Sequence, residues 1–157
     1  MPRRAREEEQ GGQEMHKAIR LLRFSYWTGA AADGFFAIAL ISPKLWGMAL
    51  TIAPFNPDLH HRMDRGVGAS LMLSWTVLLL WADRKPMERK GVLLLTVFPA
   101  LTCLAMTGIA AVVTGANSLS NMLPVFLMQG ALAALFLAGY VLARRAGSAS
   151  SPKSMYR

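Results

Sequence analysis

The chain has 157 residues, of which 54% are hydrophobic, and its formal net charge is +8. Its charged residues are concentrated at the N-terminus, in the middle and at the C-terminus, with long uncharged blocks between them. Basic residues in the short loops of a membrane protein set its orientation, so we assign the positive charge to that role and expect no nucleic-acid partner.

The N-terminal part of the chain is strongly charged. Residues 1–15 are too polar to bury a core, and they predict a mobile tail. Residues 15–23 mix basic and apolar side chains, a pattern typical of an amphipathic segment at the lipid headgroups. Acidic residues in the tail, and Arg23 at the start of the first apolar run, argue against a cleaved secretory signal. We therefore expect the first helix to be retained.

Residues 24–41 form the first long apolar run, with one carboxylate, Asp33, near its middle. About 20 apolar residues in a helix cross the hydrocarbon core of a bilayer, so this run predicts a transmembrane helix. A carboxylate at that depth costs about 3 kcal/mol, so Asp33 should face protein or water rather than lipid. Pro43 ends the helix. Residues 44–52 are too short to cross, and Trp46 among them favours a short interfacial helix.

Further apolar runs predict three more transmembrane helices, at residues 66–81, 92–113 and 123–142. Pro99 lies inside the third span, where it should free a carbonyl group and bend the helix. The charged residues 82–90 form a short loop, and the basic residues 144–157 predict a disordered tail. The expected fold is all-α, with one membrane domain at residues 16–143 in which four helices form a bundle.

The distribution of basic residues predicts how this bundle is oriented. With the N-terminus in the cytoplasm, 14 of the 17 Lys and Arg residues lie inside, and only Lys44, Arg62 and Arg65 lie outside. This distribution fits the positive-inside rule and predicts a multi-pass protein of the cell's inner (plasma) membrane with both termini cytoplasmic. It argues against a dual-topology exporter, whose loops would be nearly balanced. The basic loop should also contact anionic lipid headgroups.

Small side chains indicate which helix faces should pack, because lipid supplies no hydrophobic force between helices. The fourth span carries a ladder of small residues at every fourth position, Gly130, Ala134 and Ala138. We expect this ladder to pack within the bundle, and the alternative is that it joins two copies in a homodimer. Comparable faces on the first three spans are Gly29, Ala30, Asp33 and Ala37, then Gly66, Ser70 and Ser74, then Ala105, Gly108, Ala111 and Gly115.

Several polar side chains should lie at one depth in the outer half of the bundle. The rise of about 1.5 Å per residue brings Asp33, Thr107 and Gln129 to similar levels, with Ser70 and Arg65 near the outer end of the second span. We expect the five to converge, with Asp33 and Arg65 as an ion pair. The cluster either satisfies its own members or lines a water-accessible pocket for a small ligand or a proton.

The segment above this cluster contains His60, His61 and Asp64, which could share one helix face. A charged, solvated helix start is the default interpretation, and a pH-responsive rim is the alternative. A zinc site needs three or four converging ligands, and no HExxH or CxxC motif is present. We therefore predict neither a metal nor a cofactor.

No catalytic motif stands out, and no motif is specific enough to assign a family. The first hypothesis is a non-catalytic subunit or scaffold in a membrane assembly, with other membrane subunits or a second copy as partners. The alternative is a small-molecule or proton-coupled binder or transporter that uses the pocket around Asp33. A membrane enzyme with Asp33 or a histidine as base is the third.

Overall fold

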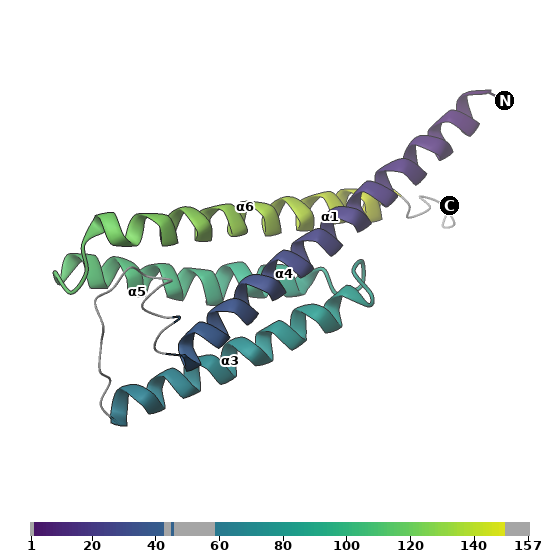
Figure 1. Ribbon diagram of the computed structural model, residues 1–157. Helices are drawn as coiled ribbons and strands as arrows, with labels where there is room; N and C mark the ends of the chain where they lie inside the picture. The colour runs from purple at the N-terminus through teal and green to yellow at the C-terminus, as the bar shows by residue number, and fades with distance from the viewer. Residues whose placement is uncertain (1, 43–44, 46–58, 150–157) are drawn as a thin grey trace, which may run out of the picture.

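The computed structural model describes residues 2–42, 45 and 59–149 of the chain. Every element among these residues is helical. The elements are α1 (Pro2–Ile41), α3 (Leu59–Asp83), α4 (Gly91–Leu95), the π-helical turn η1 (Thr96–Leu101), α5 (Thr102–Val113) and α6 (Leu119–Ala149). Because α4, η1 and α5 follow one another without a break, they form a single rod, and the fold has four rods (Figure 1).

All four rods are long enough and apolar enough to cross a bilayer. The candidate spans are Gly11–Ile41, Arg62–Asp83, Gly91–Val113 and Leu119–Ser148. Each span also exposes large apolar side chains, such as Phe35, Val77, Phe98 and Leu127, all more than half exposed. A water-soluble protein rarely exposes so much apolar surface, whereas a surface in lipid is expected to be apolar. The predicted all-α bundle of four transmembrane helices is confirmed.

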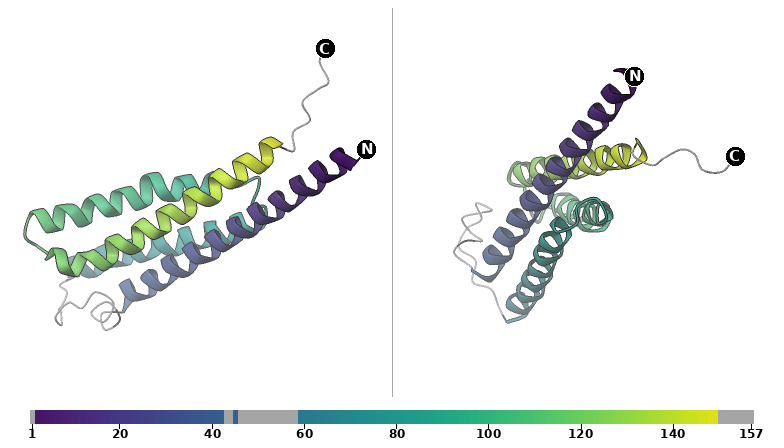
Figure 2. Two further views of the ribbon diagram at one scale, coloured as in Figure 1. Left: turned by 90° about the horizontal axis from the view of Figure 1, so that it is seen from above. Right: turned by 90° about the vertical axis from the view of Figure 1, so that its right-hand side faces the viewer.

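The helices are arranged so that both ends of the described chain lie at one end of the bundle (Figure 1). The turn between α3 and α4 lies at this same end, and the turn between α5 and α6 lies at the opposite end. The N-terminal part of α1 extends past the other helices (Figure 2). The chain thus runs along the bundle four times and returns to the end where it started. The predicted orientation requires both termini to lie at the same end.

Two expectations about the ends of the chain differ from the structure. Helix α1 begins at Pro2, so most of the predicted tail has helical backbone. Proline is favoured in a first helical turn, and the Ala, Arg, Glu and Gln residues that follow are strong helix formers. Helix α6 likewise continues to Ala149, into the segment expected to be disordered. Residues 150–157 and, apart from Leu45, the predicted interfacial helix lie outside the described residues.

Helix α1 packs closely against α3 and α6 where they cross. A Cβ atom added at Gly29 would lie 2.9 Å from Phe136 Cζ and 3.0 Å from Leu79 Cδ1. Both of these neighbours are fully buried, as are Leu22 and Tyr26 on the same face of α1. The Tyr26 hydroxyl donates a hydrogen bond to the Arg89 carbonyl at 3.1 Å, which ties this core to the turn at the terminal end.

Pro99 changes the third rod as its chemistry requires. Proline has no N–H to donate, and the structure accommodates it in the π-helical turn η1. The Thr102 hydroxyl donates to the Val97 carbonyl at 3.1 Å and so satisfies an acceptor in that turn. Before the turn, Leu93 is buried, whereas α5 after it has no buried residue. The second half of the rod is therefore more exposed than the first.

Candidate functional site

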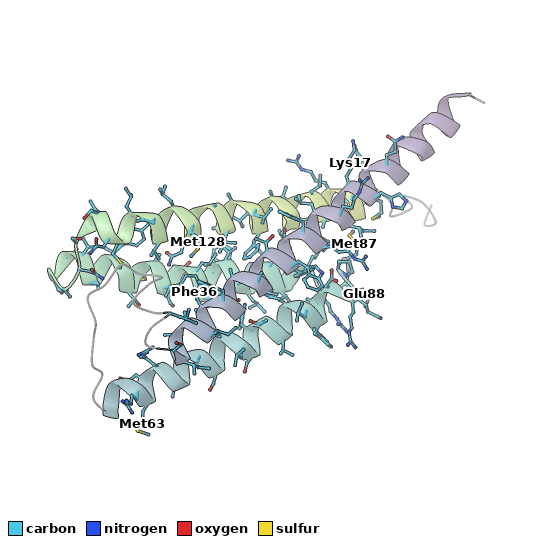
Figure 3. The ribbon with its side chains drawn as sticks, in the orientation of Figure 1. Lys17, Phe36, Met63, Met87, Glu88 and Met128 are labelled. Atoms are coloured by element: carbon cyan, nitrogen blue, oxygen red, sulfur yellow. The ribbon has the colours of Figure 1, made fainter. Side chains whose placement is uncertain are left out.

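A groove of about 450 Å³ lies between α1, α3, α5 and α6. Its wall includes Phe36 and Leu40 from α1, Met72 from α3, and Phe126 and Met128 from α6. Phe36 and Met128 mark its place in the half of the bundle away from the termini (Figure 3). No residue of α5 is buried, so the groove lies beside the more exposed half of the third rod.

The wall of the groove is mostly aliphatic, aromatic and thioether carbon. Methionine side chains are flexible and polarizable, and they adapt to ligands of different shapes. Only three polar side chains, Thr107, Asn117 and Gln129, belong to the wall, and no charged side chain does among the described residues that line it. The groove is therefore suited to an apolar molecule that makes few polar contacts.

Gln129 is the unusual member of this wall. The residue is 6% exposed, and its Oε1 atom has no hydrogen-bond partner among the described residues. A buried acceptor without a partner costs about 1–3 kcal/mol, so such groups are rare unless something outside the chain serves them. Gln129 is placed there by α6, because it lies on the helix face that also carries the buried Phe136 and Ala143.

Thr107 is the second predicted polar residue that the groove contains. Its side chain lies on α5 and donates a hydrogen bond to the Cys103 carbonyl at 2.9 Å. Such a bond to the preceding turn satisfies the hydroxyl hydrogen within the helix. The structure therefore brings Thr107 and Gln129 to one groove, and of the described residues in its wall only Gln129 has a buried polar atom without a hydrogen-bond partner.

Asp33 and Arg65 do not form the expected ion pair. The Arg65 guanidinium donates to the Ala39 carbonyl at 3.4 Å, six residues beyond Asp33 and so about 9 Å further along α1. Among the residues that the structure describes, none forms a hydrogen bond or ion pair with the Asp33 carboxylate. Asp33 is half-buried on the inward face of α1, one turn from Phe36, but it does not line the groove. The depth of each side chain, counted in residues along its helix, was not accurate enough to predict which of these residues would pair.

Ser70 was also expected in the cluster, and the structure places it elsewhere. Its side chain is exposed and donates to the Gly66 carbonyl at 2.9 Å. Ser70 is two residues from both Gly68 and Met72, which line the groove, and residues two apart on a helix face opposite sides. The predicted five-residue cluster is therefore reduced to Thr107 and Gln129.

The predicted rim lies at the start of α3. His60 and His61 have helical backbone there, and their side chains lie outside the described part of the structure. Asp64 is exposed. The expected solvated helix start and its pH-responsive alternative stay predictions.

The ladder on α6 does not pack inside the bundle. Gly130, Ala134 and Ala138 are exposed, and a Cβ atom added at Gly130 would have no neighbour within 4 Å. The ladder lies on the face of α6 opposite Phe136, so the expected bundle contact is wrong within this chain. Small residues do make the close approach of α5 to α6, where a Cβ atom on Gly108 would lie 2.8 Å from Phe126.

A polar cluster that sequence reasoning missed lies at the terminal end of the bundle. Asp83, at the last position of α3, lies 3.6 Å from Arg23 Nε and accepts a hydrogen bond from the Trp27 indole at 3.3 Å. Arg89 lies over the Trp81 ring at 3.2 Å from its centroid and donates to the Trp81 carbonyl. The signal in the sequence was the single acidic residue at the end of an apolar run, close to a basic segment. The contacts of Asp83 tie the end of α3 to the middle of α1.

No protein-family model, curated protein or solved structure matches this chain. The features that bear on function are therefore the apolar groove and the buried carboxamide of Gln129 in its wall.

Proposed function

We propose that this chain is a multi-pass membrane protein that binds a small, largely apolar molecule in the groove between α1, α3, α5 and α6. Small-molecule sites in proteins have volumes of about 300–1,000 Å³ and apolar walls with a few polar groups. A volume of about 450 Å³ and three polar side chains in the wall agree with that description. The observation that carries the proposal is the Gln129 Oε1 atom, which is buried without a hydrogen-bond partner among the described residues although Gln129 belongs to the wall of the groove.

The alternative expectation, a purely structural subunit, accounts less well for this half of the bundle. Helices that only support one another are expected to pack closely, as α1, α3 and α6 do around Gly29 and Phe136. Beside this crossing the four helices leave a groove of about 450 Å³ instead, and a polar group is buried in its wall at a cost. A ligand that occupies the groove some of the time would explain both the open groove and the buried polar group.

Photolabelling tests this function. The full chain in phosphatidylcholine nanodiscs would be irradiated with a trace of a long-chain alkane that carries a diazirine, and labelled residues would be mapped by mass spectrometry. Labelling at Leu104 and Phe126 in the groove should decrease as unlabelled alkane is added, because a site saturates. Labelling at the lipid-facing Phe98 and Leu127 serves as the internal control and should not saturate. Unsaturable labelling at all four positions would refute the function.

The basic loop and tail support a cytoplasmic position for both termini in the inner (plasma) membrane. In a Cys103→Ser background, we expect a membrane-impermeant maleimide to label Ala116→Cys in intact spheroplasts, because Ala116 is exposed in the turn that would face outward. Glu88→Cys, in the exposed turn at the terminal end, should react only after the membrane is permeabilised. The reverse pattern would show that the bundle has the opposite orientation.

A further inference from the structure

One polar group in the wall of the groove has no hydrogen-bond partner among the residues that the structure describes. The Thr107 hydroxyl already donates within α5, and Asn117 lies in the turn between α5 and α6. Gln129 is different, since it is 6% exposed and its Oε1 atom has no partner among the described residues. A ligand that filled the groove with carbon alone would leave this atom unsatisfied.

The neighbours of Gln129 restrict what that ligand can be. Val125 and Phe126 precede Gln129 on α6, Met128 adjoins it, and all line the groove. No described residue in the wall is charged, so a charged group placed beside Gln129 would be buried without a counter-ion. The polar part of the ligand must therefore be neutral and small.

A hydroxyl group meets these conditions best. A carboxamide has an oxygen that accepts hydrogen bonds and a nitrogen that donates them, and the two ends are exchanged by rotating the group. A hydroxyl both donates and accepts, so it pairs with the carboxamide in either rotation. We propose that the ligand is a neutral alkyl compound with one hydroxyl group, such as a long-chain alcohol, and that Gln129 binds this hydroxyl. This inference rests on the proposed function, because it specifies the ligand of the same groove.

The test compares two competitors of equal length, a long-chain alkanol and the matching alkane, against the diazirine alkane in nanodiscs. Wild-type protein should prefer the alkanol by about tenfold, the effect of one hydrogen bond made in an apolar site. In Gln129→Met, which keeps the length of the side chain, both competitors should act equally and labelling should stay saturable. Ser70→Ala is the matched control, and it should keep the preference because that hydroxyl lies outside the groove and is already bonded within its helix.

A stability measurement tests whether the carboxamide of Gln129 has a purely structural role. Removing an unsatisfied buried acceptor should leave the ligand-free Gln129→Met variant at least as stable as wild type, measured by titration with SDS. A clear loss of stability would show that the amide has a structural partner, and would overturn the inference. Equal competition by alkane and alkanol in wild type would also overturn it, with water as the remaining partner. Labelling that never saturates would instead refute the proposed function itself.

Discussion

Replacing Gly29 by leucine is expected to lower the free energy of unfolding of the bundle by about 3 kcal/mol, the upper end of the usual effect of overpacking. Even a Cβ atom at this position would lie 2.9 Å from Phe136 and 3.0 Å from Leu79. Both neighbours are fully buried, on α6 and α3, so neither can move without displacing its own surroundings. The three helices would have to separate at this crossing. The midpoint of an SDS titration, followed by tryptophan fluorescence, measures the change.

Gly66→Leu is the matched control for this substitution. Gly66 also lies within a helix, but a Cβ atom there would meet nothing within 4 Å. Leucine has a higher helix propensity than glycine, so this variant should be as stable as wild type or slightly more stable. Equal losses of stability in both variants would mean that glycine is needed for some other reason, and that the crossing at Gly29 does not hold the bundle together.

The sequence predicted how many helices the chain has far better than which way each helix faces. Long apolar runs identify membrane spans because the bilayer sets their length. In a soluble helix the polar face would then identify the outside, but here both faces are apolar and that signal is lost. Small residues are the remaining signal for the inward face of a membrane helix, and they identify it only in part. They correctly indicated the inward position of Gly29, and wrongly that of Gly130, which is exposed.

The groove was predicted only in part, because the sequence indicates how deep a side chain lies but not which way it faces. Counting residues gives the depth of a side chain, and depth correctly associated Thr107 with Gln129. Depth does not give direction around the helix axis, which depends on how neighbouring helices pack. Ser70 therefore belonged to the predicted cluster, although it lies on the outer side of α3. The sequence offered a pocket near these residues as an alternative, but its apolar wall depends on how α1, α3, α5 and α6 pack, which residue counting does not give.

Filling the groove from α5 provides the most direct test of binding, and Ala111→Trp is expected to reduce the affinity for the alkane at least about tenfold. Ala111 lines the groove, so an indole at this position would occupy the space of the ligand. Overpacking a filled site costs about 1–3 kcal/mol, and about 1.4 kcal/mol corresponds to a factor of ten in affinity. Saturable photolabelling at Leu104 in nanodiscs is the measurement.

Ala110→Trp separates blocking of the groove from a general effect of tryptophan in α5. Ala110 is the adjacent residue, is exposed and does not line the groove, so its indole would extend into lipid and labelling should still saturate. Both variants should keep the wild-type SDS midpoint, because α5 has no buried residue whose packing either indole would disturb. If Ala111→Trp bound the alkane as tightly as wild type, the ligand would lie elsewhere. The unpartnered Gln129 would then need an explanation other than a ligand in this groove.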